Sequence, residues 1–145
     1  MLADAATSFN GKLYIHGGGW DSLMVRQFPT SHPSMALAVL LSADATEAPG
    51  TGEFRVQLVD EDGNDTGVGA AGTIGIGLSP LASAGRKTAA PIAIPFTEIN
   101  FEKAGTYEFR LFWNEQPLDP PVQFHVISAP PLTAFQVSPP PAASV

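Results

Sequence analysis

The clearest structural signal in the chain is the segment Gly105-Thr106-Tyr107-Glu108-Phe109-Arg110-Leu111-Phe112-Trp113. From Tyr107 onward, large apolar side chains occupy every second position, which is the period of a strand with one buried face. The segment follows a short loop that ends at Gly105. Many immunoglobulin-like sandwiches open a strand in this way, with a tyrosine that turns the corner between the sheets and bonds its hydroxyl to nearby backbone. We therefore expect Tyr107 to be buried and to make that bond.

The same alternation recurs on both sides of this segment. It appears in residues 12–16, 53–59 and 122–126, and each stretch predicts a half-buried antiparallel strand. Within the first of them, Leu13 and Ile15 are expected to face inward. Residues 35–41 are apolar throughout and predict a strand in the middle of a sandwich. Residues 92–96 alternate but include a proline, which lacks a ladder donor, so they predict an edge strand.

Turn signals separate these strands. Asn10-Gly11 and residues 62–65 predict hairpin turns, because Asn, Asp and Gly tolerate positive φ. Residues 49–52 are expected to form a loop, and residues 98–104 one helical turn. The pattern as a whole predicts an all-β, immunoglobulin-like antiparallel β-sandwich over residues 1–128.

Length, charge and cysteine content exclude several classes of function. The length of 145 residues suits one domain. The net charge is −7, and the seven Lys and Arg residues are too few to form a surface that binds nucleic acid or an anionic membrane. There is no cysteine for a disulfide or thiolate metal site. The N-terminus shows no secretory signal, and no apolar run approaches the roughly 18–20 residues of a membrane helix. We expect a cytoplasmic protein, or a virion protein if the gene belongs to a phage.

A proline-rich arm follows the predicted sandwich over residues 129–145. Its prolines exclude helix and central strand, and favour an extended chain. Leu132, Phe135 and Val137 lie among them, and a purely solvating tail rarely carries such apolar side chains. We interpret these three residues as partner-docking, either on the same chain or on a neighbour.

A glycine-rich stretch resembles a nucleotide-binding motif. Residues 67–72 match G-x-G-x-x-G, but a dinucleotide site needs a helix to begin there. Residues 73–77 are instead strand-like and rich in glycine. The sequence favours a closely packed or bulged strand, and no cofactor is expected.

No metal site is expected either. Asp60, Asp62, Asn64 and Asp65 form an acidic run that could attract calcium, but the glycine and glutamate of an EF-hand loop are missing, so a solvated hairpin turn is the preferred interpretation. His16, His32 and His125 lack paired spacing and are interpreted as surface residues.

Catalytic motifs are also missing from the sequence. There is no G-x-S-x-G elbow, and Ser79 precedes a proline in a predicted loop. Glu98 and Glu102 are a candidate carboxylate pair, with nothing else to suggest sugar cleavage. We therefore expect no enzyme activity.

The N-terminal region carries a family resemblance. Residues 2–6, 11–15 and 17–20 read LADAA, GKLYI and GGGW, and this run resembles the opening of a family of uncharacterised bacterial single-domain proteins. The resemblance extends over about residues 2–128 and implies an immunoglobulin-like β fold with no assigned activity. The glycines Gly17, Gly18 and Gly19 mark a bend or a close approach. Trp20 is expected in the core or at its edge, with an exposed anchor as the alternative, and the four residues form a possible ligand-binding loop.

These observations favour a non-catalytic protein-binding or structural module. The expected role is a subunit or accessory of a larger assembly that docks through its C-terminal arm on a protein partner or on copies of itself. Two alternatives remain open, namely a phage shell decoration or accessory protein, and a sensor domain for a small ligand or calcium.

Overall fold

The structure is a computed structural model, and it describes residues 1–44, 50–77 and 87–131. The described residues form nine strands and no helix, so the all-β prediction is confirmed. In chain order the strands are β1 (Leu2–Phe9), β2 (Lys12–Gly18), β3 (Ser22–Val25), β4 (Thr30–Ala43), β5 (Gly50–Val59), β6 (Asp65–Ile76), β7 (Thr88–Phe101), β8 (Gly105–Trp113) and β9 (Gln116–Ser128).

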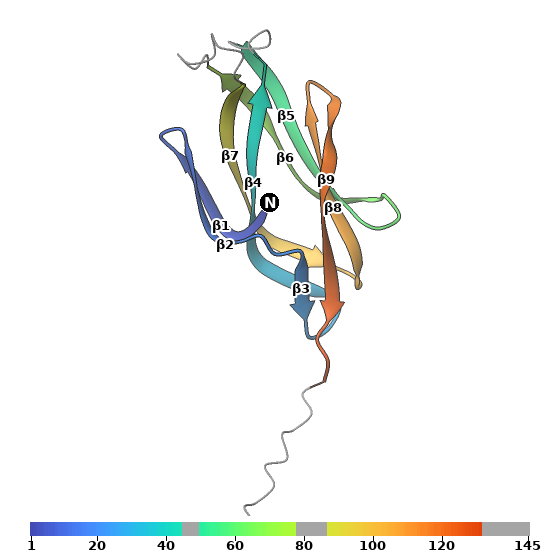
Figure 1. Ribbon diagram of the computed structural model, residues 1–145. Coiled ribbons are helices and arrows are strands. Elements are labelled where there is room, and N and C mark those ends of the chain that lie inside the picture. Colours follow the sequence, from blue (N-terminus) through green and yellow to red (C-terminus); the bar gives the residue numbers. More distant parts are fainter. Residues whose placement is uncertain (45–49, 78–86, 132–145) are drawn as a thin grey trace, which may run out of the picture.

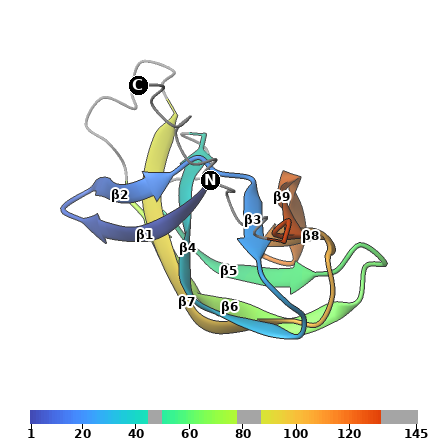
Figure 2. The same cartoon turned by 90° about the horizontal axis from the view of Figure 1, so that it is seen from below.

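The strands form two sheets that face each other, one of them curled into a half-barrel (Figures 1 and 2). The four-stranded sheet has the order β2-β1-β4-β7, and the five-stranded sheet has the order β3-β9-β8-β5-β6. Every pair of strands is antiparallel except β3 and β9, which run parallel. The expectation of a wholly antiparallel sandwich therefore fails at this one pair.

The core lies between the sheets and is rich in aromatic rings. Phe101, Phe109 and Phe124 are completely buried, and Phe124 stands edge-on to Phe101 and stacks with Phe109. Phe109 and Phe124 come from alternating strands that the sequence predicted, and Phe54, Val56 and Leu58 of β5 are buried as well, so the inward faces of β5, β8 and β9 are confirmed. Phe101 lies in β7 beyond the stretch that was predicted as a strand. Strand β7 lies at the edge of the four-stranded sheet, which confirms the edge position predicted from the proline within residues 92–96.

Tyr107 plays the part that its position predicted. Its ring is 4% exposed and packs edge-on against Phe101 at a centroid distance of 5.0 Å. Its hydroxyl donates to the carbonyl oxygen of Lys103 over 2.9 Å, which joins the start of β8 to the loop before it. Burial raises the pKa of the phenol, although the bond to Lys103 opposes that change.

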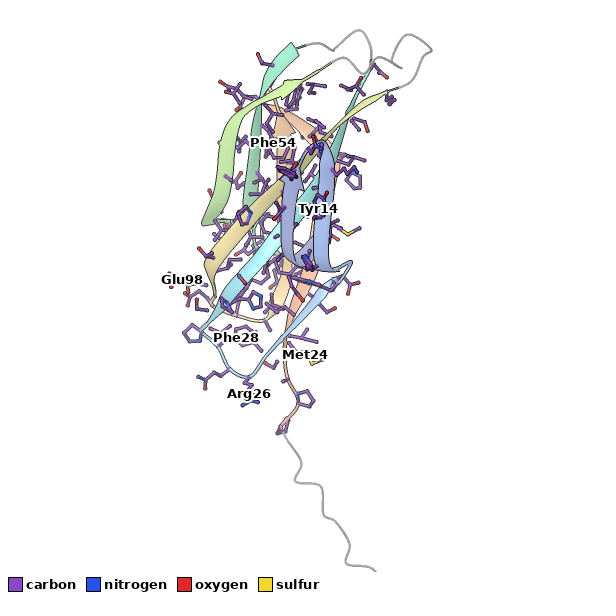
Figure 3. The ribbon with its side chains drawn as sticks, turned by 90° about the vertical axis from the view of Figure 1, so that its left-hand side faces the viewer. Tyr14, Met24, Arg26, Phe28, Phe54 and Glu98 are labelled. Atoms are coloured by element: carbon purple, nitrogen blue, oxygen red, sulfur yellow. The ribbon has the colours of Figure 1, made fainter. Side chains whose placement is uncertain are left out.

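The two longest strands bend together at one point. Cα partners run without a gap in numbering from Thr30↔Phe101 to Ala43↔Thr88, except that Pro33 and Glu98 are not paired. Glu98 has φ of 52°, and the buried side of β7 changes there from even to odd residue numbers. Glu98 lies where β7 turns (Figure 3). The helical turn expected at residues 98–104 is therefore wrong, because β7 continues to Phe101 through this bend.

The β1–β2 hairpin leaves the sheet soon after it begins. β1 pairs with β4 only through Leu2 and Ala3, while its remaining residues pair with β2 through the predicted Asn10-Gly11 turn. Tyr14 marks this hairpin in Figure 3 and is 48% exposed. Ile15 is 38% exposed, so the expectation that it faces the core is wrong; Leu13 is half-buried. The cause is that both faces of the hairpin are exposed over most of its length, since no other described strand covers it there.

The prediction of a loop at residues 49–52 is also wrong in part, because β5 already begins at Gly50. Gly52 is buried under the indole of Trp113, and a Cβ atom there would lie 2.1 Å from Trp113 Cζ2. Glycine is thus needed for close packing at this position and does not mark a turn.

Candidate functional site: a groove at the open edge of β4

The second half of β4 has a strand neighbour on one side only. The amino group of Met1 donates to the Ala38 carbonyl over 2.7 Å, and the Ala38 N–H donates to the Met1 carbonyl over 2.9 Å. Beyond Ala38, β4 pairs with β7 alone among the described strands. In an antiparallel ladder every second residue directs its N–H and C=O to the same side. Leu40 and Ser42 therefore direct these groups away from β7, toward an open edge.

A groove of about 360 Å3 runs along this edge, between the two sheets. One wall consists of Met1 and residues 38–42, and the other of Leu111, residues 118–120 and Val122. Of the described residues in these walls, Val39, Leu41, Leu111, Leu118 and Val122 direct apolar side chains toward the core, and the polar side chains are those of Ser42 and Asp119. Burial in this groove lowers the pKa of the Met1 amino group. The groove thus combines unpaired backbone groups with an apolar lining, the two features that hold an added strand.

The two strand edges beside the groove differ in their ability to accept another strand. β9 pairs with β3 only over residues 125–128, so its first half is also an edge. That half contains Pro117, Pro120 and Pro121, which have no N–H to donate, together with the charged Asp119. Prolines and charges are the usual protection of a sheet edge. The open part of β4 contains neither, so an added strand would pair with β4.

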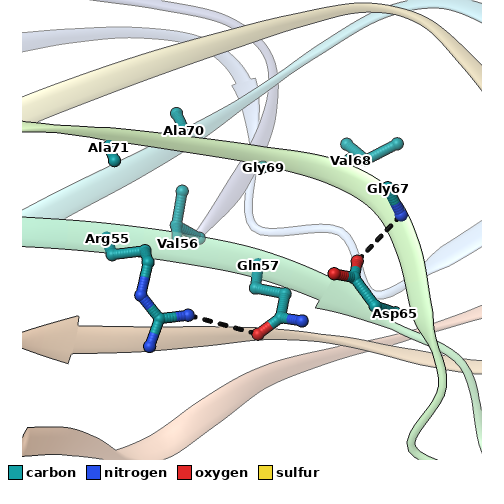
Figure 4. Close-up of a pocket in the computed structure, with 9 residues that line it drawn as sticks. All are labelled: Arg55, Val56, Gln57, Asp65, Gly67, Val68, Gly69, Ala70 and Ala71. Atoms are coloured by element: carbon teal, nitrogen blue, oxygen red, sulfur yellow. Dashed lines mark hydrogen bonds between the residues drawn. The ribbon is translucent and has the colours of Figure 1, made fainter. Parts of the chain in front are cut away.

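A second hollow, of about 370 Å3, lies on the outer face of β5 and β6 (Figure 4). Its polar side chains already have partners within the chain. The Arg55 guanidinium bonds to Gln57 and Glu115 and lies 3.9 Å from the ring centroid of Phe112. Asp65 accepts from the N–H of Gly67 over 2.8 Å. The polar side chains of this hollow are therefore already engaged within the chain, whereas the β4 groove has backbone N–H and C=O groups at an open strand edge.

The glycine-rich stretch at residues 67–72 lies in β6, so the prediction of a closely packed or bulged strand is confirmed. A Cβ atom at Gly69 would come within 2.6 Å of the Val56 carbonyl oxygen, and the β5–β6 register shifts between Gln57 and Val59. Nothing here starts a helix for a phosphate.

The acidic run forms the predicted hairpin turn between β5 and β6. The Asp60 carboxylate accepts from the backbone N–H groups of Asp62 and Asn64, over 3.0 and 2.9 Å. Hydrogen bonds from Asn64, first of all from its backbone, lower the pKa of Asp60. Lys103 lies within 3.4 Å of Glu61 and 3.3 Å of Asp62. The turn thus satisfies its acidic groups with its own backbone and one lysine.

The structure gathers neither the histidines nor the candidate carboxylate pair into a site. His16 lies in the four-stranded sheet and His125 in the five-stranded one, where His125 Nδ1 is 3.0 Å from Thr106 Oγ1. Glu98 and Glu102 are both exposed. Within residues 1–44, 50–77 and 87–131, no three His, Asp or Glu side chains are grouped to hold a metal ion. Ser79 lies outside the described residues.

The glycine loop bends the chain and leads Trp20 to the core. Gly17 and Gly19 have φ of 59° and 87°, and the Gly19 N–H donates to the Leu2 carbonyl over 2.8 Å. The Trp20 ring is half-buried and stands edge-on to Phe124 at 6.2 Å. Its buried Nε1 atom has no hydrogen-bond partner among the described residues. Trp20 thus packs against the core from its edge, which agrees with the expectation for this residue.

The arm residues Leu132, Phe135 and Val137 lie outside the described residues. The groove itself was missed by reasoning from the sequence. The sequence signal that could have indicated it is the apolar run at residues 35–41, which does not alternate with polar residues. Such a run places an apolar side chain on the outer face of the strand, and Leu40 is indeed 61% exposed.

Comparison with known proteins agrees with the sequence resemblance. No curated protein and no solved structure matches the chain. A family model described as a family of unknown function, DUF6941, matches residues 1–127, which include nearly all of the two sheets and the groove between them. The chain therefore belongs to the family of unknown function DUF6941.

Proposed function

We propose that the chain is a non-catalytic protein-binding or structural module, a subunit or accessory of a larger assembly, that docks through its C-terminal arm and accepts an extended protein segment in the β4 groove. The observation that carries this proposal is the open edge at Leu40 and Ser42 beside an apolar groove. Backbone hydrogen bonds supply affinity in such sites, and pockets for alternate side chains supply specificity.

The lining of the groove supports a binding function over a catalytic one. Among the described residues that line it, the charged groups are the amino group of Met1 and the carboxylate of Asp119, and no histidine lies in either wall. General acid–base chemistry needs a titratable pair or a nucleophile with its base. An extended peptide needs only an edge and an apolar surface.

We also propose that the two sheets are an immunoglobulin-like sandwich. Support comes from Tyr107, whose hydroxyl bonds to Lys103 at the start of β8 as in the tyrosine corners of that class. Folds of this kind serve many unrelated functions, so the functional proposal rests on the groove and not on the fold class.

The test compares two charge variants in an affinity purification from cells that express the full chain. Leu40→Asp places a charge beside the open edge, where the side chain is 61% exposed and its replacement should not disturb the core. Thr73→Asp places the same charge on the exposed face of β6 as the matched control. We expect a stoichiometric partner, which includes further copies of the chain, to be lost with Leu40→Asp and kept with Thr73→Asp. Equal recovery with both variants would show that the groove is not the docking site.

A further inference from the structure

We propose that the β4 groove is filled by the C-terminal arm of a second copy of this chain, with residues 132–138 added as a strand beside Leu40 and Ser42. This inference rests on the proposed function and names the partner that the groove accepts. Three observations carry it: the sequence of the arm, the lining of the groove, and the distance between the groove and the exit of the arm.

The arm contains one segment suited to a strand. Residues 132–138 read Leu-Thr-Ala-Phe-Gln-Val-Ser, with no proline and no charge. Thr133, Phe135 and Val137 lie at alternate positions, so they share one face of an extended chain. Pro130-Pro131 precede the segment and residues 139–141 are prolines as well. Since proline cannot donate to a ladder, the prolines limit pairing to these seven residues.

The groove matches this segment in chemistry. Val39 and Leu41 of one wall and Leu118 and Val122 of the other are apolar, so Phe135 and Val137 can leave water there. The open part of β4 spans residues 39–43, a length that a segment of seven residues covers. The chain has a net charge of −7, and an uncharged segment adds no repulsion where two copies meet.

The segment cannot reach the groove of its own copy. Val122, the last residue of β9 that lines the groove, lies about 20 Å along the strand from Ser128 at a rise of about 3.3 Å per residue. After β9 the described chain, which ends at residue 131, continues beyond the end of that strand, on the side opposite to the start of β9 (Figure 1). Phe135 follows Pro131 by four residues, so it lies at most about 14 Å from it. A second copy must therefore provide the groove.

Docking of this kind links different surfaces of the two copies. The arm leaves at the Ser128 end of β9, and the groove lies at the other end of the same strand. Head-to-tail contacts of different surfaces produce rings when the rotation closes and filaments when it does not. The proposed assembly is thus a chain of copies, each supplying one strand to the next.

A disulfide trap tests the proposal directly, because the chain has no cysteine of its own. Leu40 has its side chain on the outer face of its sheet, and Gln136 would lie on the same outer face when Phe135 points into the groove. We mix full-length Leu40→Cys protein carrying a mass tag with full-length Gln136→Cys protein under mild oxidation. The matched control mixes tagged Thr73→Cys, on exposed β6, with Gln136→Cys.

The expected result is a mixed adduct at least tenfold more abundant for Leu40→Cys than for Thr73→Cys, and reduced to the control level when Phe135→Asp is added to the Gln136→Cys chain. Ser138→Asp, at the end of the segment, serves as a second charge control and should reduce the adduct less. Equal adducts in the two mixtures would overturn self-docking. If Leu40→Asp still removes a different protein partner in the purification described above, the proposed function stands and only the identity of the occupant is wrong.

Discussion

At the scale of single residues, Tyr107 has the most specific role, because one hydroxyl joins β8 to the loop before it. We expect Tyr107→Phe to lower the free energy of unfolding by about 1 to 2 kcal/mol, since the Lys103 carbonyl then loses its donor while the ring packing stays. Tyr107→Ala should cost about 3 to 5 kcal/mol, since a buried ring is lost as well. Urea titration measures both, with an unchanged m value. Tyr14→Phe, on the exposed hairpin, is the control, and an equal effect there would refute the assigned bond.

The hydrogen bonds of a second residue, Asp60, predict that the free energy of unfolding depends on pH. Its pKa is lowered in the folded chain by hydrogen bonds from Asn64, so folding favours the charged carboxylate. A depressed folded pKa contributes stability that is fully present above the unfolded value of about 3.9 and is lost as pH falls through the folded value. We expect Asp60→Ala to destabilise the protein equally at pH 7 and pH 5, and less at pH 3. Urea titrations at the three values check this, and a constant difference down to pH 3 would contradict it.

At the scale of strands, the contact of β5 with Trp113 fixes how closely β5 and β8 pack. A Cβ atom at Gly52 would lie 2.1 Å from Trp113 Cζ2, so Gly52→Ala must displace the indole. We expect a cost of about 1 to 3 kcal/mol, as for other overpacked sites. Gly75→Ala lies on the paired strand β6, where the nearest atom, Thr51 Cγ2, is 3.9 Å away, and it should change stability little. Thermal unfolding compares the two variants. Equal midpoints would show that the Trp113 indole can move aside without a loss of stability.

Some strands could be predicted from the sequence better than others, for reasons visible in their residues. β5, β8 and β9 alternate because one face is buried and the other is in water. β1 reads LADAATSF and has only two buried residues, Leu2 and Ala3, so no alternation marks it. β3 is short and pairs with residues far along the chain, which no local pattern records.

At the scale of the whole molecule, the groove depends on where one strand stops pairing with another. β1 leaves β4 after two paired residues and turns toward β7, where Ser8 Oγ donates to the Pro91 carbonyl over 2.8 Å. That departure depends on contacts more than eighty residues apart in sequence. The composition of residues 129–145 led to the prediction of a docking arm, which stays a prediction, whereas no local pattern in the sequence marks the groove that we propose as its receptor.

The parallel pairing of β3 with β9 also determines how the molecule responds to mechanical tension. The arm leaves β9 beside β3, where the Ala129 N–H donates to the Val25 carbonyl over 2.7 Å. A pull on the arm acts along the axis of β9, so the hydrogen bonds to β3 and β8 are loaded in shear and must break together. A pull on the tip of the β1–β2 hairpin at Gly11 would instead peel pairs apart one after another. In single-molecule stretching we expect a distinctly higher rupture force through the arm than through Gly11, so that a string of such copies would bear tension at its joints without the subunits unravelling.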